Sequence, residues 1–375
     1  MSIIDIQTLL IAIIVGISCG LIGIFLVLRK MLMMIDAISH TVLLGIVISY
    51  IFVRDVTSPF ILFGATIIGV VTVFLIELLI STKRVLEDQA TGSIFPLLFS
   101  IAVILVTTKF RNTHLDNHAI VGNLELAALK QITINNINIG SKTLYISLFV
   151  LLIIILFIKI FFKELKIISF DKALAYSLGF SPILIHYLLM SMVSLTAVAS
   201  FNAVGTILVV AMMIGPAATS LLLTKDLKSA LIVSSFIAIV NSLLGYFISM
   251  FIFKGKVNIS STIAFTTLII FLLIWIFEPK KGLVSQIVKR NRQRKNFLFD
   301  AFFLHIANPN HFNDSKELNV NNLKNELKYK SEVLNKQLNK AIDLGYININ
   351  NDIINLTDIG KSFYNLKIKE LSREL

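Results

Sequence analysis

Asp36 and His40 are the residues of this sequence whose types and spacing most clearly favour chemistry at a single point. They stand four positions apart in the run from Met34 to Thr41. Residues four positions apart lie on the same face of a helix. A carboxylate and an imidazole on one face are two ligands of the kind that Mn²⁺, Fe²⁺ or Zn²⁺ accept. From the spacing alone, a metal site and a structural Asp–His hydrogen bond tying two helices together are equally supported.

A second group of metal-ligand types occurs in a short polar segment. His114, Asp116 and His118 alternate with Leu115 and Asn117. Such an arrangement could capture a divalent cation on the outer side of a membrane. The alternative is a loop that carries these residues without binding anything.

The elements that must position these residues follow from the composition. The chain has 375 residues, of which 56% are hydrophobic and 15% are charged. Soluble domains usually carry about 25% charged residues, so an ordinary soluble enzyme is excluded. A bilayer core needs about 20 apolar residues per helix, and about nine runs qualify. They lie at about 7–28, 32–53, 59–81, 92–108, 143–162, 182–200, 203–224, 229–252 and 259–277.

The sequence therefore predicts an all-α polytopic membrane protein with about nine transmembrane helices. His40 follows Arg29 by eleven positions, which is about 16 Å along a helix and near the middle of a bilayer about 30 Å thick. An ionisable residue there costs at least about 2.5 kcal/mol, so it marks a functional site by default. The stretch 119–135 is weaker and is expected as a re-entrant or surface helix.

Structural roles are expected for other residues of these runs. Glu77 precedes Lys83 and Arg84, which favours a snorkelling or ion-paired side chain. His186 is interpreted as an interfacial or packing histidine. Gly215-Pro216 should bend or break the seventh run.

The chain is expected to divide into a transmembrane domain (1–279), a basic linker (280–296) and a cytoplasmic domain (297–375). Lys and Arg favour one set of loops and the linker, which predicts an outside N-terminus and a cytoplasmic tail. Residues 331–342 and 346–356 read as a helix and a hairpin, and a last helix starts near 357. This order resembles the winged-helix fold of metal-dependent repressors, so the tail is expected as a small α+β winged-helix-like domain. Its balanced charge argues against nucleic acid as a partner, whereas the basic linker suits membrane lipid.

Several separated segments resemble the permease subunits of manganese/zinc/iron ABC importers. The matching pieces are Asp36 to His40, Glu87 to Gly92, Phe170 to Gly179, and Asn202 to Ala218. In that family the Asp and His of the second span line the translocation path and bind the metal, which implies that role for Asp36 and His40. The segment from Phe170 to Gly179 resembles the family's cytoplasmic coupling helix, in which Phe170, Asp171, Ala175 and Gly179 would contact the ATPase. Its small residues are expected to offer the docking surface.

The resemblance also implies a location and partners. The chain would be a multi-pass protein of the bacterial cytoplasmic membrane that imports Mn, Zn or Fe. Its partners would be an ATP-binding cassette ATPase, an extracytoplasmic metal-binding protein and a second permease subunit, most simply in a homodimer. No permanently bound cofactor is expected. The chain is not expected to be an enzyme, because Gly360-Lys361-Ser362 lacks the first glycine of a P-loop.

Two alternative functions belong to other classes of membrane protein. A membrane-tethered metal sensor with a winged-helix output would need a basic, DNA-binding tail, and this tail is neutral. A proton-coupled secondary transporter would show more carboxylates within its spans.

Overall fold

The computed structural model describes residues 3–54, 58–109, 124–129, 131–134, 137–308, 323, 331–350 and 353–374. It divides into two compact units, Met1–Gly282 and Leu283–Leu375. Each unit has its own buried core, so each is described by itself.

Among the described residues, unit 1 holds nine helices that are long and apolar enough to cross a membrane. The prediction of a polytopic helical membrane protein is therefore confirmed. Their full bounds, several of which exceed the apolar windows, are α1 (Ile3–Leu28), α2 (Leu32–Val53), α3 (Pro59–Ser81), α4 (Glu87–Lys109), α7 (Lys142–Ile160), α10 (Pro182–Val204), α11 (Thr206–Leu223), α12 (Leu227–Phe247) and α13 (Ile259–Phe277). A π-helical turn, η1 (Ile248–Ile252), extends α12.

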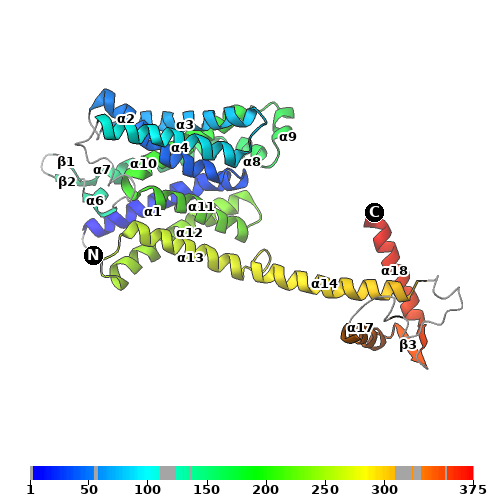
Figure 1. The fold of residues 1–375 in the computed structure, drawn as a ribbon. Coiled ribbons are helices and arrows are strands. Elements are labelled where there is room, and N and C mark those ends of the chain that lie inside the picture. Colours follow the sequence, from blue (N-terminus) through cyan, green and yellow to red (C-terminus); the bar gives the residue numbers. More distant parts are fainter. Residues whose placement is uncertain are drawn as a thin grey trace. The chain divides into compact units, whose positions relative to one another are not determined.

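Short elements lie at the two ends of this bundle (Figure 1). Helix α6 (Leu124–Leu129) and the hairpin of β1 (Gln131–Ile134) and β2 (Ile137–Ser141) lie near the N-terminus. Helices α8 (Phe162–Phe170) and α9 (Lys172–Ser177) lie at the opposite end, which is also where α13 ends. The expected helix over 119–135 is thus wrong in extent, because the described part of this stretch holds a six-residue helix followed by a strand.

Helix α1 lies in the middle of unit 1 and packs against α7, α10, α11 and α12. Small residues permit a close approach, since a Cβ on Gly23 would overlap the carbonyl oxygen of Met213. Two hydroxyls of α12 donate to carbonyls of α1, from Ser234 to Gly20 at 3.1 Å and from Ser242 to Ala12 at 3.2 Å. Small residues and interhelical hydrogen bonds hold helices together where lipid gives no hydrophobic drive between them. The single cysteine, Cys19, is completely buried in this helix.

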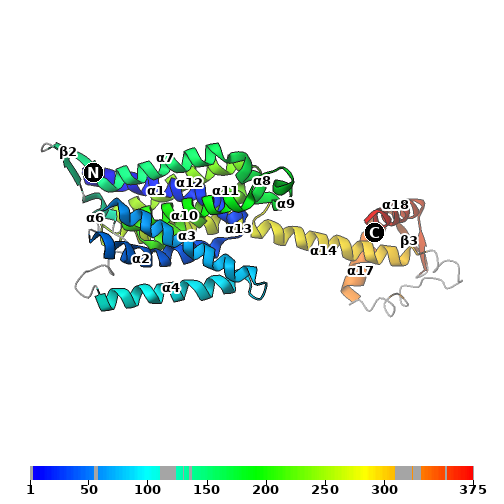
Figure 2. The same cartoon turned by 90° about the horizontal axis from the view of Figure 1, so that it is seen from above.

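The outer helices show many exposed apolar side chains. Phe60 and Phe63 of α3, Ile104 of α4 and Phe149 of α7 are all more than half exposed. In Figure 2, α4 runs along the margin of the bundle. Its contacts are with α2 and α3. Exposed apolar side chains of this number suit a hydrocarbon surrounding and would be a liability in water.

Of the bend or break expected at Gly215-Pro216, the break does not occur, because α11 continues through Pro216 to Leu223. The chain turns sharply at Gly205 instead, where φ is 81° and α10 gives way directly to α11. A glycine adopts this left-handed conformation without the penalty that a side chain would bring.

Unit 2 begins with α14 (Leu283–Ile306), so the segment expected as a linker is helical from Leu283 onward. It continues with α17 (Ser331–Asp343), the antiparallel hairpin of β3 (Ile347–Asn350) and β4 (Ile353–Leu356), and α18 (Asp358–Glu374). Phe302, Phe303 and Leu338 are among its buried residues. The expected order of helix, hairpin and helix is present, and the winged-helix assignment stays a prediction.

Candidate metal site and coupling segment

Helix α2 places Asp36 and His40 side by side. The Asp36 Oδ1 and His40 Nε2 atoms are 3.4 Å apart, and the two side chains are 50% and 38% exposed. The residues between them, Ala37, Ile38 and Ser39, are buried on the other side of the helix. The contact lies within one helix, so it does not tie two helices together.

Two aromatic rings of α4 hold the His40 imidazole. The Phe95 ring stacks on it with centroids 5.7 Å apart, and the Phe99 ring meets it edge-on at 5.8 Å. Next to His40, the Thr72 hydroxyl of α3 donates to the Thr41 hydroxyl at 2.9 Å. The imidazole is therefore oriented by α4, and its helix is fixed to α3 one residue away.

Asp36 and His40 form an ionisable pair whose exposed face lies within a span, since they are the fifth and ninth residues of α2. A half-exposed carboxylate and imidazole facing hydrocarbon would be costly, so this face must meet water or another protein surface. Within the described part of the chain, three or more His, Cys, Asp or Glu residues do not come together as a possible metal site. A metal ion held here would complete its coordination with water, backbone or a second subunit.

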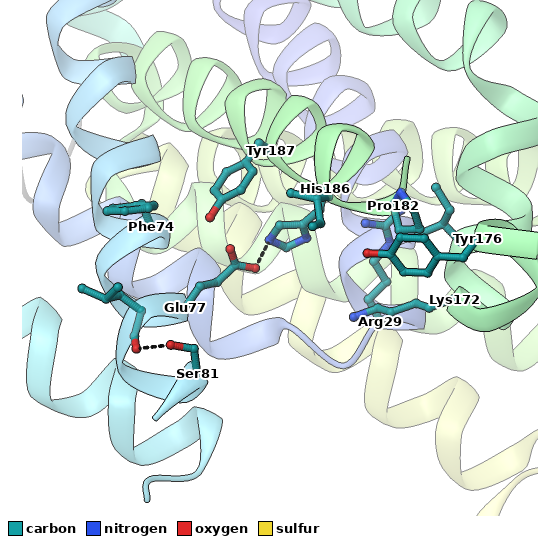
Figure 3. Close-up of a pocket in the computed structure, with 12 residues that line it drawn as sticks. Arg29, Phe74, Glu77, Ser81, Lys172, Tyr176, Pro182, His186 and Tyr187 are labelled. Carbon is teal, nitrogen blue, oxygen red and sulfur yellow. Dashed lines mark hydrogen bonds and ion pairs between the residues drawn. The ribbon is translucent and has the colours of Figure 1, made fainter. Parts of the chain in front are cut away.

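A second ionisable pair lies near the end of unit 1 that carries α9. The Glu77 Oε1 atom of α3 is 2.6 Å from His186 Nε2 of α10, and the Tyr187 hydroxyl contacts the same carboxylate. The pair opens into a pocket of about 370 Å³ whose lining includes Arg29, Lys172 and Tyr176 (Figure 3). Glu77 has a close partner, as expected of an ion-paired side chain, but that partner is His186, and the contact is an ion pair only when the imidazole is protonated.

Arg29 follows the last residue of α1 and lines this pocket. Its Nε donates to the Ser169 hydroxyl of α8 at 3.3 Å. Burial lowers the pKa of Arg29 to about 10, which still leaves the guanidinium charged at neutral pH. Arg29 thus joins the central helix α1 to the segment that precedes α9.

Helix α9 is built as a compact projection. The Asp171 carboxylate caps it by accepting hydrogen bonds from the backbone N–H groups of Ala173 and Leu174, at 2.9 and 3.0 Å. Gly179, with φ of 82°, turns the chain toward α10. Ala175 is completely buried, so it anchors α9 and does not lie on the docking surface that the small residues were expected to offer.

Four of the exposed side chains of this segment are large and apolar. Phe170, Leu174, Tyr176 and Leu178 are between 48% and 67% exposed. An exposed apolar patch on a projecting loop is typical of a protein-binding site. Phe170 was expected to contact the ATPase, whereas Leu174, Tyr176 and Leu178 were not, although bulky residues in a polar segment between two spans were a signal for them. The candidate cation ligands His114, Asp116 and His118 lie outside the described residues.

Comparison with known proteins agrees with this architecture. The model of the ABC 3 transport family matches residues 4–278. The chain is 40% identical over 284 residues to the manganese transport system membrane protein MntD of Bacillus subtilis (strain 168), covering 76% of this chain and 95% of the relative. It is 37% identical over 304 residues to the zinc transport system membrane protein TroD of Treponema pallidum (strain Nichols), covering 80% of this chain and 81% of the relative.

A solved structure is similar as well. The structure described as PsaBC from Streptococcus pneumoniae in complex with Fab matches with a TM-score of 0.64 at 32% identity, covering 78% of this chain and 96% of that one. The fold and the half-exposed polar face define a membrane permease. The chain belongs to the ABC 3 transport family, as the resemblance predicted.

Proposed function

We propose that this chain is the permease through which Mn²⁺, Zn²⁺ or Fe²⁺ enters the cytoplasm, and that Asp36 and His40 are its metal ligands. The observation that carries the proposal is the exposed Asp36–His40 face of α2 within a span. A carboxylate and a neutral imidazole bind these three ions without a strong preference among them. The manganese and zinc transport relatives support the same class of cargo.

The incomplete ligand set favours a paired permease. One chain supplies two ligands, so two copies that face each other across a path supply four. Four protein ligands satisfy Zn²⁺, and water completes the larger coordination shell of Mn²⁺ or Fe²⁺. We therefore propose a homodimer with the α2 faces of both copies lining the path.

Import against a gradient needs a source of energy that this chain does not supply, since its sequence lacks a P-loop. A separate ATPase would dock on α9, where Phe170, Leu174, Tyr176 and Leu178 offer apolar contacts around the capped helix. Movement of α9 would then expose the Asp36–His40 face first to one side of the membrane and then to the other. An extracytoplasmic binding protein would deliver the ion to the opposite end.

The orientation follows from these roles. The ATPase is cytoplasmic, so the end that carries α9 is the cytoplasmic end. An odd number of spans then places the N-terminus outside and unit 2 in the cytoplasm. The basic residues of the loops and of α14 favour the same orientation.

The test is metal uptake by the complete complex with Asp36→Ala or His40→Ala. Each change removes half of the ligand set, so we expect uptake to fall by at least about tenfold. Uptake of Mn²⁺, Zn²⁺ and Fe²⁺ should be measured separately, because the ligand types accept all three. Ser49→Ala, on the same helix, is the control. Unchanged uptake by both ligand variants would overturn the assignment.

A further inference from the structure

The Glu77–His186 contact has a position that the transport site itself does not explain. It lies at the end of unit 1 that carries α9, and it joins α3 to α10, which are separated by more than 100 positions in the chain. We propose that Glu77 and His186 are positioning residues that pass the movement of α9 to α3, and through α3 to the metal ligands on α2. The inference rests on the proposed function, because it requires an ATPase that moves α9.

The α9 side of this connection is short. Only residues 178–181 separate α9 from α10. Two backbone hydrogen bonds close that link, from Gly179 to Tyr176 and from Phe180 to Ala175, both at 3.1 Å. Lys172 and Tyr176 of α9 line the same pocket as Glu77 and His186 (Figure 3). We therefore expect a displacement of α9 to move His186 and Glu77 before the rest of α10 and α3.

The contact between α10 and α3 continues toward the middle of both helices. The Ser194 hydroxyl of α10 donates to the carbonyl oxygen of Thr66 in α3 at 3.1 Å. A Cβ on Gly69 would overlap the Ser194 hydroxyl, so the two backbones approach closely there. The two helices are fixed to each other at their middle and at their α9 end.

The contact between α3 and α2 reaches the metal face. Thr72 of α3 donates to Thr41 of α2, and Thr41 is the neighbour of His40. Further along, a Cβ on Gly45 would lie 2.5 Å from the Cα of Ala65, so these helices also pack backbone to backbone. Glu77 and Thr72 are five positions apart, about 7.5 Å along α3. A rigid α3 thus connects the His186 contact to the residue beside His40.

A polar contact suits this role better than an apolar one. Lipid tails are as apolar as leucine, so apolar side chains in a membrane resist separation only weakly. The contact of 2.6 Å joins a carboxylate that is 32% exposed to an imidazole that is 11% exposed, and it fixes both the distance and the direction between the two helices. Such a contact can transmit movement between α10 and α3 both when the helices approach each other and when they separate.

A second metal site is the competing interpretation of the same two side chains. The described residues do not add a third His, Cys, Asp or Glu ligand to the pair. Arg29 and Lys172 line the same pocket, and their positive charges oppose a cation there. The positioning role therefore fits the surroundings better.

The experiment uses the full permease with its ATPase and binding protein in proteoliposomes, and it measures ions imported per ATP hydrolysed. Glu77→Leu and His186→Phe remove the polar contact, and we expect each to lower this ratio by at least about fivefold. Glu77→Gln keeps an oxygen that can accept from His186, so it should retain an intermediate ratio. The double variant should be no worse than either single variant, because both remove one contact. Ser81→Ala is the control, since Ser81 lines the same pocket but donates only to Leu78 of its own helix.

Metal binding to the nucleotide-free complex separates the outcomes. The proposal expects unchanged affinity and stoichiometry in the Glu77 and His186 variants, which also shows that they fold. Loss of a bound ion would overturn it in favour of a second metal site. An unchanged ratio, with transport and hydrolysis falling together, would overturn it in favour of a purely structural contact. Absence of metal uptake by the unmodified complex would instead reject the proposed function.

Discussion

His40 is held from outside its own helix, and this decides what its imidazole can do. Phe95 and Phe99 of α4 occupy two sides of the ring, and Asp36 lies beside its Nε2 atom. A ligand held in its productive rotamer loses little conformational entropy when an ion binds. In the proposed metal site, the aromatic rings would do for His40 what outer-shell hydrogen bonds do for metal ligands elsewhere.

We expect Phe95→Ala to weaken metal binding without removing a ligand. The imidazole would gain rotational freedom, and loss of a supporting group typically costs about tenfold in affinity. The measurement is equilibrium binding of Mn²⁺ or Zn²⁺ to the purified complex. Phe149→Ala is the matched control, because that ring is 65% exposed on α7 and far from the pair in sequence. An equal effect of both changes would show that the loss is not specific to the His40 contact.

The sequence predicted one of the two ionisable pairs in unit 1. The Asp36–His40 pair was predictable because both residues lie on one helix, where spacing determines the face. The Glu77–His186 contact was not, because it depends on how α3 and α10 pack. Its available signal was topological, since the end of the third run and the start of the sixth must lie on the same side of the membrane. The burial of Ala175 likewise depends on packing, because the sequence does not reveal which side of a short helix faces the bundle.

At the scale of elements, α9 is a helix of six residues that is too short to be stable by itself. Short helices in water depend on caps and on tertiary contacts. Here the Asp171 cap and the buried Ala175 supply both. The apolar patch of Phe170, Leu174, Tyr176 and Leu178 is only as rigid as this small helix.

Asp171→Ala should therefore uncouple the ATPase while leaving metal binding intact. Loss of an N-cap costs about 1 kcal/mol, enough to fray a helix of this length. We expect lower metal-stimulated ATP hydrolysis and weaker association with the ATPase, measured by hydrolysis rate and co-purification. Asp226→Ala removes a comparable cap from α12, where the carboxylate accepts from the Ser229 N–H. If Asp226→Ala impairs coupling as much as Asp171→Ala does, the effect does not come from α9.

Elements were largely predictable from hydropathy, and the exceptions have physical reasons. Helix α4 begins at Glu87, before its apolar run, because acidic residues favour the first turn of a helix. Helix α11 tolerates Pro216 within its interior, as helices in membranes often do when neighbours pack around them. The sharp turn occurs at Gly205, and the sequence alone does not distinguish that glycine from those that serve close packing.

At the scale of the whole molecule, the chain consists of two units with separate cores. The family match covers residues 4–278 and therefore stays within unit 1. Helix α14 extends through the boundary expected at residue 297, so unit 2 starts at Leu283. Its buried residues include Phe302, Phe303 and Leu338. We propose that unit 2 regulates or docks beside the ATPase and does not contribute to ion selection.

Deleting residues 283–375 tests this division, since it removes unit 2 without cutting a helix. Unit 1 keeps its own core, so we expect the preference among Mn²⁺, Zn²⁺ and Fe²⁺ to stay unchanged. The control of uptake by metal supply, or the assembly with the ATPase, should change. Competitive uptake and co-purification are the measurements. If deletion leaves both control and assembly as they were, unit 2 has neither proposed role.

The burial of Cys19 has a practical consequence for labelling chemistry. It is the one cysteine of the chain, and it lies completely inside the bundle. A water-soluble thiol reagent added to the folded protein therefore has little native sulfur to modify. If cysteines are introduced one at a time along α2, labelling by the reagent can therefore be assigned to the introduced thiol. The reagent can then be applied from either side of the membrane. Its reaction shows which positions near Asp36 and His40 become accessible to water as ATP is bound and hydrolysed.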